Sequence, residues 1–202
     1  MVNAAVAAGV KKITFSSVIH PSISKMKNHS EKRPVEEAIF ESGLAFTVLQ
    51  PTMFMQTLSA NWKEVTEQST FSLPYPNDKQ ASCVDYRDVA EAAAIALTSD
   101  KLDYGTFELC APGMVDRVQL TRIMSEVLGR TITPVELTFD NWVKQTHMPE
   151  GLVRDGMQSM FEDYARYGFP GGNALVLRTI LGREPRTLQD FFREQADHAS
   201  EC

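Results

Sequence analysis

Short apolar runs alternate with amphipathic stretches along the first two thirds of this chain. Residues 10–15 (VKKITF) and 45–49 (AFTVL) are rich in β-branched and aromatic side chains, which is typical of strands. Between them, residues 34–43 repeat apolar side chains at helical spacing and end in glycine. Strand, helix and strand in this order predict an α/β fold in which a parallel sheet is covered by helices.

The same alternation continues to about residue 137, after which the pattern becomes mainly helical. We expect further strands at 71–73, 81–84, 106–110 and 131–137, and helices at 53–65, 88–97 and 118–128. Asp88 is the expected N-cap of the 88–97 helix, with Arg87 pairing at the surface, and Thr187 is the expected N-cap of the last helix. We therefore divide one domain into an α/β part, 1–137, and a helical C-terminal part, 138–202.

Composition and charge narrow the class of protein. The chain has 202 residues, of which 43% are hydrophobic, and a formal net charge of −6 without a cluster of Lys and Arg. Nucleic acids and anionic membranes attract a basic patch, so we expect neither as a partner. No apolar run approaches the roughly 20 residues that span a bilayer, and the first residues lack the pattern of a secretory signal.

The cysteines and histidines argue against disulfides and metal sites. Cys83, Cys110 and Cys202 are odd in number and have no CxxC spacing, and the first two lie in apolar runs. Free buried thiols indicate a reducing compartment, so we expect a cytoplasmic protein. The histidines are too scattered to predict a zinc site.

Polar residues gather where the first two predicted strands end. Ser16 and Ser17 follow the first strand, Lys32 lies in the long loop after it, and the Gln50–Met55 turn follows the second. In an open α/β sheet, ligands bind outside the carboxyl ends of the strands. We expect these residues to face one crevice. His29, in the same loop, is expected to face solvent.

Five segments, in order and at consistent spacing, resemble the NmrA-like family of atypical short-chain dehydrogenase/reductase relatives, which have an NAD(P)-binding Rossmann fold. The segments are AAVAAGVKKITFSSV (4–18), K-x-P-V-E (32–36), SGLAFTVLQPTMFMQ (42–56), VDYRDVAEAAAIAL (84–97) and LGREPRTLQDFFRE (181–194). The resemblance implies that residues 1–137 form a partial Rossmann-like, doubly wound region with interleaved substrate-side segments. The helix-rich C-terminal region then covers the substrate side.

The resemblance also implies a set of residues around the nicotinamide half of NAD or NADP. Lys32 stands in place of the family's ribose-binding lysine and is the one catalytic candidate. The cofactor-binding residues that it implies are Ser16, Ser17, Lys32, Pro51, Thr52 and Met53. The alternative interpretations are a solvated Lys32 and serine hydroxyls that serve nearby backbone groups.

The chain departs from the family pattern at the position of the proton donor. Catalytic short-chain dehydrogenases carry Tyr four residues before the Lys, and here that residue is Asn28, whose amide cannot deliver a proton to a carbonyl. The catalytic Ser of the superfamily falls on Ser17 or on Val18, depending on the alignment. Carbonyl reduction by a Tyr–Lys pair is therefore not supported.

The second departure concerns the Gly-rich turn that binds the pyrophosphate in this family. The only glycine cluster, Gly168 with Gly171 and Gly172, comes late and follows no strand. We therefore expect an N-terminally truncated chain that lacks the first strands of the sheet and retains only a nicotinamide half-site. The 10–15 strand then has an unpaired edge that favours self-association.

Two functions stay open. One is an NmrA-like NAD(P)-binding protein that senses redox state, regulates, or acts as a weak NAD(P)-dependent oxidoreductase on a small apolar substrate. The other is a regulatory module that binds a protein partner or itself and no dinucleotide. Several methionines either line an adaptable apolar pocket or fill the core: Met53, Met55, Met148, Met157 and Met160.

Overall fold

The computed structural model describes residues 1–200, so Cys202 lies outside the described part of the chain. The two apolar runs of the opening stretch form neighbouring parallel strands, β1 (Lys12–Ser16) and β2 (Ala45–Pro51). On its other side β2 pairs in parallel with β6 (Gly105–Leu109), which gives the strand order β1-β2-β6. The expected α/β fold with a parallel sheet is confirmed.

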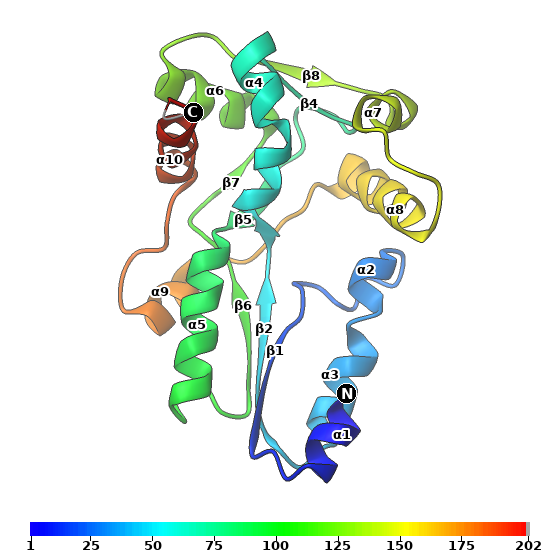
Figure 1. Cartoon of the computed structure of the whole chain (residues 1–202), viewed down its shortest axis with the longest axis vertical. Coiled ribbons are helices and arrows are strands. Elements are labelled where there is room, and N and C mark those ends of the chain that lie inside the picture. The colour runs from blue at the N-terminus through cyan, green and yellow to red at the C-terminus, as the bar shows by residue number, and fades with distance from the viewer. Residues whose placement is uncertain (201–202) are drawn as a thin grey trace.

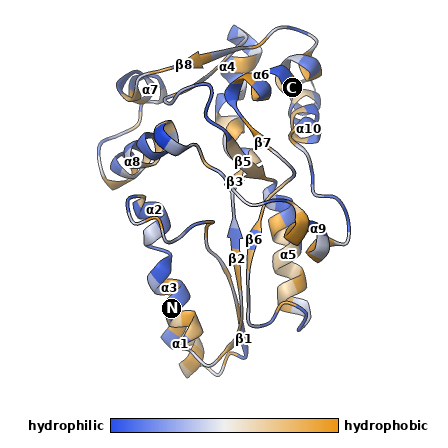
Figure 2. Cartoon of the chain, turned by 180° about the vertical axis from the view of Figure 1, so that it is seen from behind, coloured by the Kyte–Doolittle hydropathy of each residue, from blue (hydrophilic) through white to orange (hydrophobic). Residues whose placement is uncertain are grey.

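Helices cover both faces of this sheet (Figure 1). The helices on one face are α1 (Val2–Ala7) and α3 (Arg33–Phe40), and those on the other are α5 (Tyr86–Thr98) and α9 (Leu175–Leu181). Because side chains alternate along a strand, the adjacent Val48 and Leu49 of β2 point to opposite faces and enter two separate apolar clusters. Figure 2 shows that α5 is apolar along most of its length, as expected of a helix packed on a sheet.

Shorter elements form a second region beyond the carboxyl ends of these strands. Its strands are β3 (Met53–Phe54), β4 (Thr70–Leu73), β5 (Ala81–Val84), β7 (Met114–Val115) and β8 (Thr133–Glu136). Its helices are α2 (Lys27–Ser30), the 3-10 helix η1 (Met55–Asn61), α4 (Trp62–Gln68), α6 (Arg117–Leu128), α7 (Phe139–Thr146), α8 (Leu152–Tyr167) and α10 (Leu188–Ser200). In Figure 1, α7 and α8 lie together on one side of this region, and α6 and α10 lie on the other.

The segment after β2 differs from the expected helix over 53–65. Met53 and Phe54 instead form β3, which pairs with β5, and the chain then continues as η1 before α4 begins at Trp62. Pairing with a strand about thirty residues away outweighs the local helical pattern here. The consequence is that Met53 is held at a strand position directly beyond the end of β2.

The expectation that Asp88 is the N-cap of this helix was wrong. Asp85 is the N-cap of α5, because its side chain accepts a hydrogen bond of 2.8 Å from the backbone N–H of Arg87. Asp88 is fully buried and accepts from the backbone N–H of Arg186 at 2.7 Å and from the guanidinium of Arg183 at 2.8 Å. It therefore ties α5 to the segment between α9 and α10.

The side chain of Arg87 also interacts with Asp85 at the start of α5. Burial alone would raise the pKa of Asp85, but hydrogen bonds from Arg87 hold that pKa below its ordinary value. Arg87 also forms an ion pair of 2.7 Å with Glu194 of α10.

The expected N-cap at Thr187 is confirmed, since its hydroxyl accepts from the backbone N–H of Asp190 at 3.1 Å.

We predict that Asp88→Asn lowers the free energy of unfolding by roughly 2–3 kcal/mol. Breaking a fully buried pair costs about 3–5 kcal/mol, and the loss is smaller here because the side chains of Arg183 and Arg186 keep 36% and 34% of their surface exposed. Urea unfolding measures the change. Asp100→Asn, at an exposed position, is the control and should change stability by less than about 0.5 kcal/mol. Equal effects of the two substitutions would contradict a structural role for Asp88.

We also predict that β1 mediates self-association. Within residues 1–200 it pairs with β2 alone, and Ser17 N–H and Lys11 C=O both bond to the β2 side, so the alternating N–H and C=O of Thr14 point away from β2. Such an edge templates pairing with another chain. Sedimentation velocity should show association that rises with concentration, and Thr14→Pro should weaken it.

The matched control for this edge is Ile13→Pro, which removes an N–H that faces β2 and should destabilise the fold instead. A wild-type chain that stays monomeric and melts sharply and reversibly would contradict the prediction.

Candidate functional site

The carboxyl ends of β1 and β2 bring the predicted serines to one place. Ser16 lies opposite Leu49 in the parallel register, and the backbone N–H of Ser17 donates to Leu49 O at 2.8 Å. Ser16 is exposed. Ser17 is 6% exposed, and its hydroxyl has no hydrogen-bond partner within the described residues. A buried hydroxyl without a partner is costly, so a hydrogen bond to this atom would be favourable.

Lys32 lies beside the same strand end. It stands immediately before α3, and its Nζ is 5.7 Å from the centroid of the Phe15 ring. An ammonium over an aromatic face is attracted by the ring quadrupole. Lys32 is half-buried and is oriented by its contact with Phe15 of β1. Lys25 and Lys27, which come before it in the chain, are exposed.

The Pro51–Met53 turn closes the end of β2. Pro51 and Thr52 are buried, and the backbone N–H of Thr52 donates to Leu109 O of β6 at 3.1 Å. One residue earlier, Gln50 donates to Glu36 Oε1 at 2.9 Å, so the end of β2 is also fixed to α3. Of the predicted cofactor residues, Met53 is the one among the residues that line the large cavity described below.

The segment 168–172 contributes to this site although its sequence predicted only a loop. Phe169 pairs with Ala81 of β5, and the backbone N–H of Gly171 donates to Ser82 Oγ at 2.9 Å. A Cβ at Gly171 would lie 2.4 Å from Thr52 Cγ2, a distance that no side chain tolerates. The Pro-Gly-Gly sequence was the available sign of such a close backbone approach.

The expectation that His29 faces solvent was wrong. It is 2% exposed, and its Nδ1 lies 2.8 Å from the carbonyl oxygen of Ile19, which can only accept. Burial lowers the pKa of His29 below its ordinary value, although backbone contacts with Ile19 and His20 oppose that shift. Its ring also meets the edge of Phe169 at 5.6 Å between centroids. A neutral His29 therefore holds the loop after β1 against the 168–172 segment.

A cavity of about 600 Å³ opens beyond Met53. This volume is within the usual range for small-molecule sites. The lining side chains come mainly from η1, α4, α7 and α8: Met53, Thr57, Leu58, Ala60, Asn61, Glu64, Leu73, Tyr75, Trp142, Gln145, Thr146, Met157, Met160, Phe161 and Tyr164. Three methionines thus line a pocket, whereas Met55 is in the core and Met148 packs against the apolar cluster around Phe161.

Position 28, where the catalytic dehydrogenases carry tyrosine, lies at the edge of this cavity. The Nδ2 of Asn28 is 3.8 Å from Sδ of Met160, which lines the cavity. The amide supplies a weak hydrogen-bond donor there and no acidic proton.

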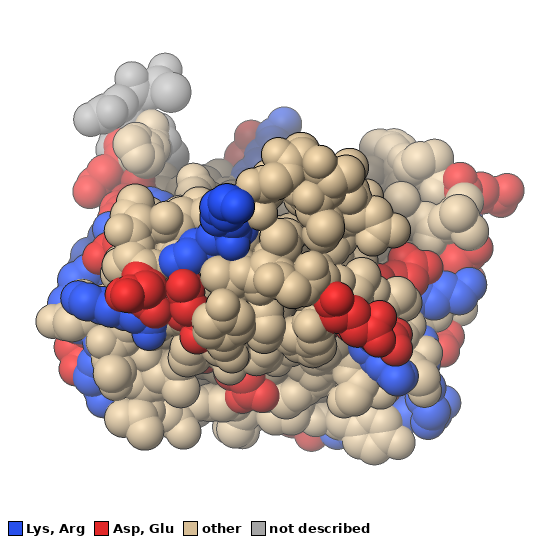
Figure 3. Space-filling model, turned by 90° about the horizontal axis from the view of Figure 1, so that it is seen from below, with Lys and Arg blue, Asp and Glu red and all other residues tan. Residues whose placement is uncertain are grey.

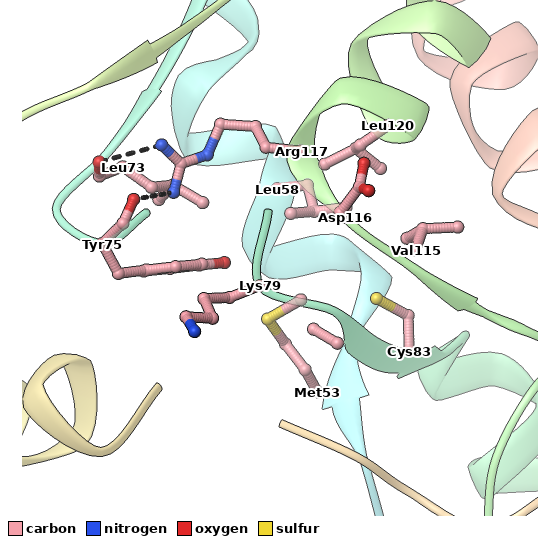
Figure 4. A pocket seen from close by; sticks show the side chains of 11 residues that line it. Met53, Leu58, Leu73, Tyr75, Lys79, Cys83, Val115, Asp116, Arg117 and Leu120 are labelled. Carbon is pink, nitrogen blue, oxygen red and sulfur yellow. Dashed lines mark hydrogen bonds between the residues drawn. The ribbon is translucent and has the colours of Figure 1, made fainter. Parts of the chain in front are cut away.

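A separate, small cavity of about 10 Å³ shares several lining residues with the large one, and Figure 4 shows the side chains around it. Arg117 donates to the carbonyl oxygens of Leu73 at 3.1 Å and Tyr75 at 2.8 Å, and its guanidinium lies 4.6 Å from the Tyr75 ring centroid. The small cavity has room for about one water molecule. The role of Arg117 is structural, because it fixes the Leu73–Tyr75 segment, and Leu73 and Tyr75 line both cavities.

The two buried thiols are poor nucleophiles. Burial raises the pKa of Cys83 to about 12 and that of Cys110 to about 11, so both remain protonated near neutral pH. Neither forms a disulfide. They behave as small apolar side chains of the core, as expected from their place in the sequence.

Charge and metal ligands give no further site within the described residues. Acidic and basic side chains are interspersed on the face shown in Figure 3. Among residues 1–200, no group of three His, Cys, Asp or Glu side chains is arranged to hold a metal ion. In the same part of the chain, no helix has both the length and the apolar character needed to cross a bilayer.

Comparisons with known proteins agree with this fold. The NAD(P)H azoreductase of Xenophilus azovorans is 28% identical over 97% of this chain and 69% of its own length. The NADPH-dependent quinone oxidoreductase QOR2 of Escherichia coli, solved with NADPH, superposes with a TM-score of 0.85 at 22% identity, over 96% of this chain and 69% of that one. The negative transcriptional regulator NmrA, solved with NADP, gives a TM-score of 0.70 at 18% identity, over 99% and 69%.

A comparison with protein families gives the same result as the comparisons with single proteins. The model of the NmrA-like family aligns with residues 1–192, which include both the strand ends and the walls of the cavity. The chain therefore belongs to the NmrA-like family.

Proposed function

We propose that this protein binds NAD or NADP through a nicotinamide half-site at the ends of β1 and β2, and that it acts as a redox or regulatory protein. The observation that supports this most directly is the buried, unpartnered hydroxyl of Ser17 at the end of β1, where Lys32 lies over the Phe15 ring of the same strand. Support also comes from the relatives, since the azoreductase is named for NAD(P)H and the two solved structures contain NADPH and NADP.

The residues present fit a nicotinamide riboside. Lys32 has three N–H donors that suit the paired hydroxyls of a ribose, and Ser17 offers a hydroxyl to a carboxamide. The Pro51–Met53 turn provides an apolar wall for a flat ring, with Thr52 fixed by its bond to Leu109. When bound, the dinucleotide supplies a hydride or, in a sensor, a redox-dependent shape. The chain's own contribution is to bind and orient the ring and to keep it next to the cavity.

Asn28 favours binding and regulation over carbonyl reduction. A carbonyl that accepts a hydride also needs a proton, and an amide at this position does not provide one. A second candidate function, a module that pairs with a protein partner without dinucleotide, is favoured by the open edge of β1. The reduced, buried Cys83 and Cys110 support the proposal that the protein works in the cytoplasm.

We predict that this chain binds NADPH with a Kd below about 100 µM and that Lys32→Ala weakens binding about tenfold. Loss of hydrogen bonds from a charged donor is worth about 1.4 kcal/mol, which is a factor of ten. Calorimetric titration measures both values. Lys27→Ala removes an exposed lysine from the same loop and should leave the affinity within about twofold.

The outcome separates the two candidate functions. Absence of NADPH binding up to millimolar concentrations would exclude the dinucleotide function for this chain. Equal losses in Lys27→Ala and Lys32→Ala would show a general charge effect and remove Lys32 from the site.

Ser17→Ala should stabilise the free protein and weaken NADPH binding at the same time. The substitution removes a buried hydroxyl without a partner, which we expect to raise the free energy of unfolding by about 0.5–1 kcal/mol. Thermal unfolding without ligand and NADPH titration test the two halves of this prediction. Ser22→Ala, at an exposed position, should change neither. A destabilised Ser17→Ala would mean that the hydroxyl already serves the fold.

A further inference from the structure

One side of α5 is uncharged and largely exposed along the whole helix. Tyr86, Ala90, Ala93 and Leu97 recur at helical spacing and therefore share this side, which we call the α5 stripe. Tyr86 and Leu97 keep 51% and 59% of their surface exposed, and Ala90 is exposed as well. Single exposed apolar residues are common, whereas a continuous stripe indicates an interaction surface.

The charged residues of α5 serve the other side of the helix. Asp88 and Glu91 bind Arg183, which directly follows α9, and Arg87 forms an ion pair with Glu194 of α10. α5 lies over β1 and β2, and α9 lies over β6. The α5 stripe therefore faces away from α9, towards the side of the sheet on which β1 has no neighbour within residues 1–200.

α5 and β1 are fastened to each other. Lys12 Nζ donates to the carbonyl oxygen of Ala96 at 3.1 Å and to that of Ser99, and it also pairs with Asp103. Lys12 begins β1, whereas Ala96 lies near the C-terminal end of α5, so the helix runs antiparallel to the strand. The open edge of β1 and the α5 stripe consequently form one surface of fixed shape.

The edge of β1 offers backbone groups and one hydroxyl to a partner. Lys12, Thr14 and Ser16 direct their N–H and C=O away from β2, because those of the alternate residues bond to β2. Thr14 Oγ1 is buried, and it has no hydrogen-bond partner in the part of the chain that the structure describes. Such a hydroxyl gains a hydrogen bond when a polar side chain is placed opposite it.

Two copies of this edge fit together in one orientation about a two-fold axis. In a parallel pair, the bonding residues of one strand lie opposite non-bonding residues of the other, which excludes a symmetric parallel pair of identical edges. The antiparallel register with Thr14 opposite Thr14 pairs Lys12 with Ser16 on both sides and uses every outward residue of β1. Val10 adds nothing to the edge, because its N–H already donates to Ala5 O.

The same register brings the two α5 helices to packing distance. Neighbouring strands lie about 4.8 Å apart, so a helix centred between β1 and β2 lies about 5 Å from the two-fold axis. The two helices are then about 10 Å apart, within the range at which helices pack against each other. The small Ala90 and Ala93 lie at the crossing point, and Tyr86 of each copy meets Leu97 of the other.

We propose that two copies of this chain form a dimer about a two-fold axis at Thr14, with β1 paired to β1 and the α5 stripe packed on the α5 stripe. Three strands from each copy then form one sheet in the order β6-β2-β1-β1-β2-β6. A second copy is the partner because the edge is complementary to itself, the two Thr14 hydroxyls face each other, and the stripe carries no charge that repels its own copy. Each β1 edge is used once, so association through it stops at the dimer.

The second copy also brings a basic side chain to the nicotinamide half-site, a point that rests on the proposed function. In this register Lys11 of the second copy lies opposite Ser17, on the face of the sheet that carries Phe15 and Lys32. Lys11 is exposed, and its ammonium suits the pyrophosphate next to the nicotinamide riboside of a dinucleotide. Within one chain, a strand from Lys11 to Ser17 spans about 20 Å, so Lys11 acts on the half-site of the other copy.

Amide hydrogen exchange tests the register. At high protein concentration the amides of Lys12, Thr14 and Ser16 should exchange at least about tenfold more slowly than in the dilute chain, whereas those of Ile13 and Phe15, which face β2, are protected in both. Sedimentation velocity of the concentrated sample should show twice the monomer mass. Unprotected amides at Lys12, Thr14 and Ser16 in the concentrated sample, a chain that stays monomeric, or association beyond the dimer would overturn the proposal.

Matched variants test the helix contact. Leu97→Lys places a charge in the α5 stripe and should weaken dimerisation at least about tenfold, because an ammonium would be buried against Tyr86 of the second copy. Thr98→Lys adds the same charge at an exposed position about 100° further round the helix, and it should change the dimerisation constant by less than about twofold. Equal effects of the two would remove α5 from the interface. If Leu97→Lys unfolds, the exchange pattern of the wild-type chain decides by itself.

A third pair of variants tests the contribution of Lys11. Lys11→Ala should leave the dimer intact and weaken NADPH binding about fivefold, while Lys101→Ala, at another exposed position, should leave it within about twofold. Unchanged affinity in Lys11→Ala, or an equal loss in Lys101→Ala, would remove Lys11 from the half-site. Because the dimer is measured without ligand, a wild-type chain that binds no NADPH refutes the proposed function and leaves the dimer standing.

Discussion

The carboxyl end of β2 is the point on which the rest of the structure depends. Its backbone pairs with β1 on one side and β6 on the other, and Thr52 just beyond it receives the 168–172 segment at a distance that only glycine allows. The segment 168–172 directly follows α8, so its contacts with Thr52 and Ser82 fix the C-terminal end of α8 relative to β2 and β5.

Local patterns in the sequence were sufficient for much of this arrangement. β1 and β2 were evident from runs of β-branched and aromatic residues, and the caps at Gly129 and Thr187 follow rules that act over a few residues. The likeness to the NmrA-like family added the place of Lys32 and Ser17 relative to the sheet. These features depend on neighbours in the chain or on the order of segments, and both can be seen without coordinates.

The remaining features depend on partners that are distant in sequence. Nothing around Asp88 indicates that Arg183 and Arg186 would reach it from the other end of the chain. Phe169 and Ile19, which enclose His29, are likewise separated from each other by most of the protein. The polar network on Glu64 joins α4, β4 and α7, and no local pattern around Glu64 indicates these partners.

The buried His29 makes the stability of the loop after β1 depend on pH. A neutral imidazole fits between Ile19 and Phe169, whereas an imidazolium would have to give up hydration there. Since burial lowers the pKa of His29 in the folded chain, the unfolded chain binds the proton more readily, and the stability from this contact is lost as pH falls below the ordinary histidine value of about 6.5. Mild acidification therefore weakens the packing of the loop after β1 against the 168–172 segment.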